Sequence, residues 1–394
     1  MSQSAQFACK KAKQCGGCQL QNMTYPEQLV YKRNKVRRYL GKFHKIPPVI
    51  GMQDPTHYRC KVQAAFGTTR AGKIISGIYQ SSSHRIVNVD SCLTEDKRAD
   101  EIIVGLRALL PSFGIRPYDE DSRRGLLRHV LVRRSPNTKE ILVVLVCASA
   151  VFPSRKNFVQ ALLKQFPDIT SVVLNINPRR TSMVLGEREQ VLYGPGYIYE
   201  QLCGMRFRIS PRSFAQINPV QTEILYRTAI EAAEMNGTER VLDAYCGVGT
   251  IGLIASPHCA KVLGAEVNAD AVRDAKRNAQ ENGVRNAEFV CADAGELMRE
   301  LADAGEHLDL LFTDPPRAGC SMEFLQSVLK LKPARIVYIS CNVETQARDL
   351  KVLCDGGYRV TFAQPVDLFP YTNHVESVVC LTRRLDNELR ERMN

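Results

Sequence analysis

The 394-residue sequence predicts an α/β protein whose C-terminal part is a doubly wound, mainly parallel sheet. After residue 236, short apolar runs alternate with amphipathic helical segments, which is the pattern of repeated β–α units. The first apolar run leads into a Gly-x-Gly-x-x-Gly turn at 247–252. Such turns are typical of sheets that bind a nucleotide-like cofactor at their carboxyl edge. We expect a Rossmann-like C-terminal domain preceded by an α+β domain.

The composition favours an acidic partner and a reduced environment. Lysine and arginine number 53 against 41 acidic residues, and this net charge of +12 favours nucleic acid, although many basic proteins bind nothing acidic. No apolar run approaches the ~20 residues needed to span a bilayer, and no secretion signal opens the chain, so we expect a cytoplasmic protein without membrane contact. In that setting the 14 cysteines favour reduced thiols, metal ligands or catalysis over disulfides.

Three cysteines near the N-terminus suit a metal or cluster. Cys9, Cys15 and Cys18 lie close together in sequence, and two glycines precede Cys18. The glycines let the backbone fold around a metal and leave amides free to point at sulfur. Three thiolates leave one ligand position open, for which Cys92 is the natural candidate and Cys60 a competitor. The spacing does not choose between a [4Fe–4S] cluster and zinc, and unligated structural cysteines are the remaining reading.

A basic helix is expected next. Residues 24–27 read as a capping box with an early proline, and Leu29, Val36 and Leu40 fall on one face. Residues 1–45 carry ten lysines and arginines against one glutamate. The basic face is either solvated or in contact with phosphates.

The middle of the chain reads as mainly strands, with a basic character from several arginines. We divide the chain at 1–95 and 96–209, which form one domain, and at 210–394. Strands are expected at 58–67, 77–79, 126–134, 140–148, 172–178 and 181–185, and helices at 95–110 and 154–166.

The C-terminal part begins with a polar loop and a helix at 220–235. Strands are expected at 240–245, 261–266, 288–291, 308–313 and 335–339, with helices from 249 and at 269–282, 295–304, 322–330 and 344–354. The last segments, 358–367 and 376–382, read as an antiparallel edge.

Acidic residues at the strand ends indicate which cofactor the glycine loop holds. Gly247 and Gly249 alone fit nicotinamide, flavin and methyl-donor proteins. Glu266 ends the next strand, where an acid can accept both ribose hydroxyls, and Asp293 follows the third strand, near the expected adenine. Asp314 then opens an Asp-Pro-Pro-Arg turn that a dehydrogenase does not need but a methyltransferase can use to hold a planar base. S-adenosylmethionine is therefore favoured over NAD.

Cys341 ends the strand at 335–339, beside this cofactor edge, where a cysteine is placed to be a nucleophile. Taken alone, it reads as one more buried apolar residue. Thiolate addition to C6 of uracil makes C5 able to take a methyl group, after which a base removes the C5 proton. Glu376, at the start of the last strand, is the candidate base, and His374 is a rival. The plain alternative is that Glu376 is only a glutamate on the surface of a strand.

These motifs together resemble the RNA 5-methyluridine methyltransferases, a family that includes 23S rRNA uracil-C5 and tRNA uracil-54 enzymes. The matching segments span nearly the whole chain: Cys9 and Cys15-Gly-Gly-Cys18 with Cys92, Phe214-x-Gln216-x-Asn218-Pro219, Asp243-x-Tyr245-Cys246-Gly247-x-Gly249, Asp314-Pro315-Pro316-Arg317, Ser340-Cys341-Asn342 and His374-Val375-Glu376.

The resemblance implies methylation of C5 of a specific uridine in 23S rRNA, by a class I methyltransferase domain and with RNA as the partner of a monomer. It implies that Cys341 is the nucleophile and Glu376 the proton acceptor. The residues that would bind S-adenosylmethionine are Gln216, Tyr245, Glu266 and Asp314. A [4Fe–4S] cluster would be held by Cys9, Cys15, Cys18 and Cys92.

Some features depart from the family pattern. Many relatives carry an N-terminal β-barrel domain, which we expect to be absent because the cysteine loop begins at residue 9, as in the shorter enzymes that act on uracil 747 of 23S rRNA. Cys60 stands where relatives often have asparagine, and Tyr245 replaces a common phenylalanine. The alternatives are a tRNA enzyme, a non-catalytic RNA-binding protein, and an adenine or protein-nitrogen methyltransferase, which would not need Cys341.

Overall fold

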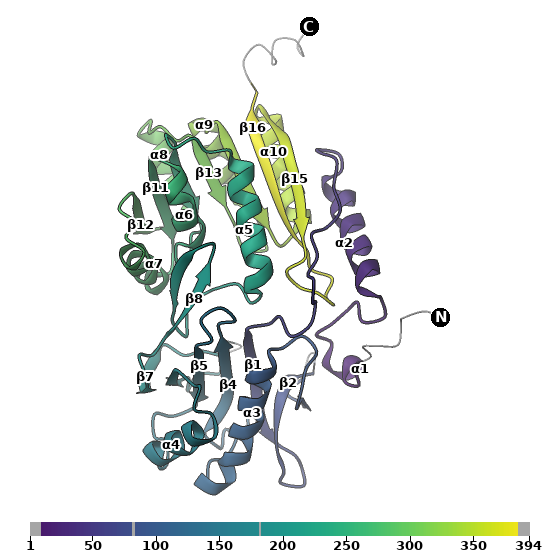
Figure 1. Cartoon of the computed structure of the whole chain (residues 1–394), viewed down its shortest axis with the longest axis vertical. Helices are drawn as coiled ribbons and strands as arrows, with labels where there is room; N and C mark the ends of the chain where they lie inside the picture. The colour runs from purple at the N-terminus through teal and green to yellow at the C-terminus, as the bar shows by residue number, and fades with distance from the viewer. Residues whose placement is uncertain (1–8, 81–82, 181–182, 385–394) are drawn as a thin grey trace.

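The computed structural model describes residues 9–80, 83–180 and 183–384. Within these ranges the strands form two seven-stranded sheets, one above the other in Figure 1, and a two-stranded hairpin between them. The sheet of the N-terminal half has the order β3-β2-β1-β4-β5-β6-β7. Neighbouring strands run antiparallel except for the parallel pair β5 and β6. The bounds are β1 Lys61–Thr68, β2 Ile74–Tyr79, β3 Ile86–Asn88, β4 Leu127–Arg134, β5 Ile141–Cys147, β6 Ser171–Ile176 and β7 Arg188–Tyr193.

The sheet of the C-terminal half has the order β12-β11-β10-β13-β14-β16-β15. The first five strands are parallel, and β16 and β15 complete the sheet in antiparallel fashion, as the sequence predicts. The bounds are β10 Arg240–Ala244, β11 Lys261–Glu266, β12 Ala287–Cys291, β13 Leu310–Thr313, β14 Arg335–Ser340, β15 Tyr358–Val366 and β16 Glu376–Arg383.

Helices cover both faces of the C-terminal sheet. One face packs on α5 Pro219–Ala233, α6 Thr250–Ala255 and α7 Ala269–Glu281. The other face packs on α8 Ala294–Asp303, α9 Met322–Leu331 and α10 Val343–Asp355. The N-terminal sheet carries α3 Lys97–Leu109 and α4 Arg155–Gln165 on one face. No helix in the described part of the chain is long and apolar enough to cross a membrane.

A hairpin that sequence reasoning missed joins the two halves. It consists of β8 Ile198–Leu202 and β9 Met205–Ile209 and packs against α5, α6 and α7. Its apolar side chains share one core with Leu131 and Val144 of the N-terminal sheet and with Leu225 of α5. The second face of the N-terminal sheet is thus buried against the C-terminal half, not against helices of its own.

The strand expected at 181–185 is wrong in its described part. Residues 181–182 lie outside the described ranges, and residues 183–185 are not in a strand. The Asn177 side chain donates to the carbonyls of Met183 (2.8 Å) and Val184 (2.9 Å), so these groups bond a side chain and not a strand. The partner of β6 is β7, which begins at Arg188.

Helix α2, Tyr25–Leu40, begins with the predicted capping box. Its basic side is only partly exposed to solvent, because Lys32 is buried. It lies beside α10 and β15 of the C-terminal half (Figure 1), and Val36 and Leu40 are buried in the core there. Lys32 is fully buried and forms an ion pair of 2.6 Å with Asp367. Lys32 is therefore unavailable to phosphate, which corrects the expectation for that residue.

The same helix holds the loop that precedes β16. Lys32 Nζ donates to the Phe369 carbonyl (2.9 Å), and Lys35 Nζ donates to the Asn373 carbonyl (2.9 Å). The Gln28 side chain accepts from the Tyr371 amide (2.8 Å). The N-terminal segment thereby fixes the backbone that leads into Glu376.

We expect the substitution Lys32→Met to lower the free energy of unfolding by about 3–5 kcal/mol, because it leaves Asp367 buried without its cation. The measurement is urea unfolding of the full chain. Lys45→Met, at an exposed position just beyond the same helix, should change stability by less than about 0.5 kcal/mol. Equal stability of Lys32→Met and wild type would show that the ion pair does not hold the helix.

Candidate active site

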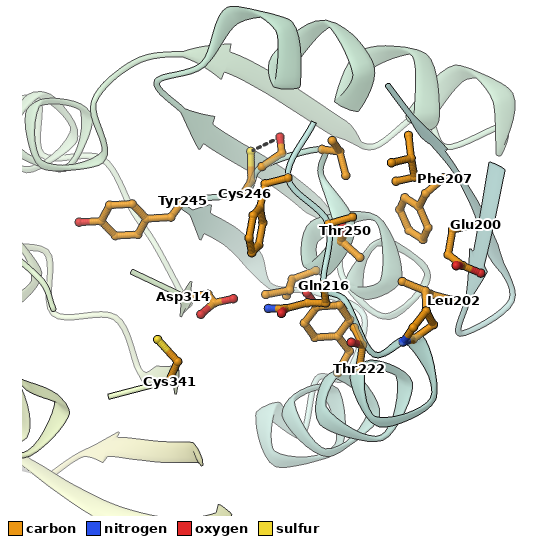
Figure 2. Close-up of a pocket in the computed structure, with 18 of the residues that line it drawn as sticks. Glu200, Leu202, Phe207, Gln216, Thr222, Tyr245, Cys246, Thr250, Asp314 and Cys341 are labelled. Atoms are coloured by element: carbon orange, nitrogen blue, oxygen red, sulfur yellow. Dashed lines mark hydrogen bonds between the residues drawn. The ribbon is translucent and has the colours of Figure 1, made fainter. Parts of the chain in front are cut away.

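A cavity of about 720 Å³ lies at the carboxyl edge of the C-terminal sheet, and we call it the edge cavity. Its wall comes from the ends of β10, β11, β13 and β14, the start of β16, the hairpin β8–β9 and residues of the N-terminal sheet. Figure 2 shows Cys341, Asp314 and Tyr245 toward one end and Glu200, Leu202 and Phe207 toward the other. The predicted residues that line it are Gln216, Tyr245, Gly247, Glu266, Asp293, Asp314, Cys341 and Glu376.

Strand pairing brings Cys341 and Glu376 together. Ser340 and Ser377 form the pair at the end of the antiparallel ladder between β14 and β16. Cys341 follows Ser340 and Glu376 precedes Ser377, so the two residues come to lie across from each other at the sheet edge. Glu376 is also paired with Val366 of β15, which fixes it from the other side.

The turn that carries Asp314 is bonded to the turn that carries Cys341. The Asn342 side chain caps α10 by accepting from the Glu344 amide (3.2 Å), and its Nδ2 donates to the Arg317 carbonyl (2.9 Å). Thr345 Oγ1 donates to the same carbonyl (3.2 Å). The ends of β13 and β14 are therefore held at fixed positions relative to each other.

Burial dominates the electrostatics of this end of the cavity. Glu376 is 3% exposed, and burial, with a further contribution from Asp314, raises its pKa well above the ordinary value. Burial also raises the pKa of Asp314 to about 7 and that of the Cys341 thiol above its ordinary value, which Glu376 and Asp314 raise further. Arg317 lowers the pKa of both Cys341 and Glu376. Within the described residues the Glu376 carboxylate accepts no hydrogen bond, so no protein donor separates it from a ligand in the cavity.

His374, the rival base, also lines the cavity. Burial is the main cause that lowers the pKa of His374, and Arg317 and nearby lysines lower it further. Its ring contacts that of Phe369 edge to face, with 6.1 Å between the ring centroids. A neutral imidazole can accept a proton, but His374 is two residues away from the position opposite Cys341.

The glycine loop is shaped by two carboxylates. Glu266 accepts from the amides of Gly247 (3.1 Å) and Asn268 (2.8 Å), and Asp243 accepts from the Gly252 amide (2.7 Å). Gly249 does not line the cavity: it has φ +81° and packs so closely on Phe289 that a Cβ would lie 2.8 Å from its ring. Gly249 therefore acts on the shape of the loop and not by forming the wall.

The remaining predicted cofactor residues have structural partners as well. Asp293 lines the cavity and caps α8 through the Gly295 (2.8 Å) and Glu296 (3.1 Å) amides. The loop at Gln216 is bonded to the start of the N-terminal sheet, because the Cys60 amide donates to the Ile217 carbonyl (2.8 Å).

These groups fit S-adenosylmethionine. An acid stands at the end of β11, a second at the end of β12, and the half-buried Asp314 carboxyl is close to the thiol of Cys341. Glu266 retains acceptor capacity for hydroxyls beyond its two backbone bonds. The cavity volume of about 720 Å³ lies in the range of small-molecule and cofactor sites.

Sequence reasoning missed some residues of the edge cavity. Tyr226 is buried in its wall, near Gln216. Pro219, Thr222 and Tyr226 share one face of α5, a spacing that a search of the helix could have found. Arg133 and Glu200 reach the cavity from distant strands, and no local pattern marks them.

The N-terminal cysteines lie near one another without forming a ligand set. Cys9 and Cys18 both raise the pKa of Cys15, for which burial is the main cause, and Glu95 raises the pKa of Cys15, Cys18 and Cys92 alike. In the described ranges, however, no three His, Cys, Asp or Glu side chains are grouped closely enough to hold a metal ion. The predicted cluster is not supported. Cys60 lines the edge cavity instead.

Comparison with known proteins places these observations in context. The model of the tRNA (uracil-5-)-methyltransferase family matches residues 186–384. An RNA methyltransferase of Oceanobacillus iheyensis is 45% identical over 379 residues, which cover 95% of this chain and 82% of that protein. One from Halalkalibacterium halodurans is 44% identical over 378 residues, with the same coverage.

A solved structure agrees over nearly the whole chain. It is the tRNA (uracil-54, C5)-methyltransferase of Pyrococcus abyssi in complex with S-adenosyl-L-homocysteine, with a TM-score of 0.79, 31% identity and coverage of 93% of this chain and 86% of that chain. These matches confirm the resemblance that the sequence motifs indicate, the α/β methyltransferase fold and the use of S-adenosylmethionine.

Proposed function

This chain belongs to the tRNA (uracil-5-)-methyltransferase family and is an RNA uracil-C5 methyltransferase, and we propose that it methylates one specific uridine of 23S rRNA. The observation that carries the catalytic part of the proposal is the position of Cys341 across from Glu376, beside Asp314, in one cavity. A half-buried thiol and a buried carboxylate in this arrangement supply the nucleophile and the base that the reaction needs.

Cys341 acts first. Its Sγ attacks C6 of the uracil as a thiolate, the new S–C6 bond forms, and the electron pair of the C5–C6 double bond becomes available at C5. S-adenosylmethionine, when bound, supplies the electrophilic methyl group that C5 takes. Because burial raises the pKa of Cys341, only a small part of it is thiolate near neutral pH, and Arg317 increases that part.

Glu376 completes the reaction. After methylation, C5 carries both the methyl group and its original hydrogen. The Glu376 carboxylate takes this hydrogen as a proton, the C5–C6 double bond re-forms, and the Cys341 thiolate leaves. The raised pKa of Glu376 makes its carboxylate a stronger base than an exposed glutamate.

The other residues of the cavity hold the cofactor. We assign Glu266 to the ribose hydroxyls, Asp293 to the adenine and Asp314 to the space beside the transferred methyl group. The full proposed set is Gln216, Tyr245, Gly247, Glu266, Asp293 and Asp314, with Gly249 shaping the loop.

Two RNA classes compete as substrate. The motifs resemble those of a family that includes 23S rRNA uracil-C5 enzymes, which supports ribosomal RNA. The likeness to the Pyrococcus abyssi tRNA enzyme supports uridine 54 of tRNA as the second candidate. In either case we propose that the chain acts as a monomer in the cytoplasm. A purely RNA-binding role would leave the pairing of Cys341 with Glu376 without purpose.

We expect Glu376→Gln to attack RNA and then stall, because the amide cannot take the C5 proton. A covalent RNA–protein band should accumulate on a denaturing gel in the presence of S-adenosylmethionine. Cys341→Ala should form no such band and transfer methyl groups at least about a thousandfold more slowly. His374→Gln is the matched control and should give no stalled band; a band with His374→Gln and none with Glu376→Gln would assign the base to His374.

The substrate is decided by mass-spectrometric mapping of 5-methyluridine in rRNA and tRNA from a strain that lacks the gene. We expect one 23S rRNA position to lose its methyl group and tRNA to be unchanged. Loss at tRNA position 54 alone would replace the ribosomal proposal with the second candidate.

For the N-terminal cysteines we propose that Cys9, Cys15, Cys18 and Cys92 hold a [4Fe–4S] cluster. The proposal rests on the sequence resemblance and on four free thiols. Three of them, Cys15, Cys18 and Cys92, interact electrostatically with Glu95, and Cys9 interacts with Cys15 and Cys18. No catalytic step depends on this group.

Anaerobically purified protein should be brown and carry about four irons per chain. The iron should be lost in Cys18→Ser and retained in Cys60→Ser, since Cys60 lines the edge cavity. Stoichiometric zinc, or colourless protein without iron, would rule out the cluster.

A further inference from the structure

Arg133 is a buried cation that has no partner among the described residues. It lies near the end of β4 and is 5% exposed. Across the described ranges its guanidinium has no hydrogen bond and no ion pair, although it forms part of the wall of the edge cavity. An unpaired buried guanidinium is costly, so a group of this kind indicates an anion that arrives with a ligand.

No neighbour on the N-terminal sheet can neutralise this charge. The register places Lys61 of β1 directly across from Arg133, a second cation. Cys60, the preceding residue, is buried, and burial raises the pKa of its thiol to about 12, so it is neutral near pH 7. Arg134, the next residue on β4, is paired with Asp96 (2.9 Å), so the two adjacent arginines differ in whether they have a partner.

Glu200 of the hairpin presents the opposite charge to the same part of the cavity. It is 7% exposed, and its Oε1 accepts from Ser135 Oγ (2.8 Å), from the Gln201 amide (3.0 Å) and from Asn137 Nδ2 (3.4 Å). Its Oε2 has no bond to any described residue. Arg133 and Glu200 influence each other electrostatically but are too far apart to form an ion pair. A ligand that carries both charges would satisfy both groups.

The location agrees with one part of the cofactor. Figure 2 shows Glu200 toward one end of the cavity, Cys341 and Asp314 toward the other, and Gln216 and Thr222 between them. The Cys60 thiol interacts electrostatically with Arg133 and donates its Sγ–H to the Gln216 carbonyl (3.8 Å). If the sulfonium lay near Cys341 and the ribose at Glu266, the amino-acid arm would extend past Gln216 toward Arg133 and Glu200.

We propose that Arg133 binds the α-carboxylate, and Glu200 Oε2 the α-ammonium, of the amino-acid arm of S-adenosylmethionine. This inference rests on the proposed function, because it takes S-adenosylmethionine as the ligand of the cavity. It also explains why the N-terminal sheet contributes to the cofactor site: the sheet supplies the cation, and the hairpin supplies the anion. A guanidinium holds a carboxylate through two parallel hydrogen bonds, which a lysine cannot reproduce.

The test compares two ligands by calorimetry. S-adenosylhomocysteine has the amino-acid arm, whereas 5′-methylthioadenosine has the same adenosine and sulfur but lacks the arm. Arg133→Met should weaken binding of S-adenosylhomocysteine by about 10- to 100-fold and leave binding of 5′-methylthioadenosine within twofold. Glu200→Gln should show the same selectivity with a smaller loss, and Arg133→Lys should fall between wild type and Arg133→Met.

Arg134→Met is the matched control, because it removes the adjacent arginine, which already has a partner; both affinities should remain those of wild type. Equal losses for the two ligands in Arg133→Met would show a structural role and overturn the proposal. Unchanged S-adenosylhomocysteine affinity with weaker RNA binding would assign Arg133 to an RNA phosphate. If the wild-type chain bound neither small ligand, the proposed function itself would fail, and this inference with it.

Discussion

The antiparallel pairing of β16 with β14 is the constraint on which the site depends. A sheet built only from parallel β–α units would place every functional residue at the end of a strand and none at a beginning. Because β16 enters the sheet in the opposite direction, its first residue lies at the carboxyl edge of the parallel strands. Glu376 therefore meets Cys341, although 34 residues separate them in sequence.

The edge cavity depends further on contacts from the N-terminal half. Helix α2 holds the loop before Glu376 through Lys32, Lys35 and Gln28, and the start of β1 is bonded to the loop at Gln216. A shared apolar core joins the N-terminal sheet, the hairpin β8–β9 and α5. The N-terminal half is therefore not a separate attachment to the C-terminal half, because residues from both halves form the wall of one cavity.

Burial gives this cavity its chemistry and also limits it. Removing Glu376, Asp314 and Cys341 from water raises the pKa of all three, which makes the carboxylate of Glu376 a better base but reduces the thiolate fraction of Cys341. Arg317 acts against both effects from the neighbouring turn. In the proposed mechanism, the balance between these groups determines how readily the thiol attacks.

The sequence by itself determined the order of strands and helices in the C-terminal half, the antiparallel edge and the positions of Gly247, Glu266, Asp314, Cys341 and Glu376, because each follows from a local period or a strand end. Only the tertiary structure decided the partner of β6, the burial of Lys32 and the arrival of Arg133 and Glu200 in the cavity. These depend on side chains from distant strands meeting across an interface, and no spacing within one segment records such a meeting.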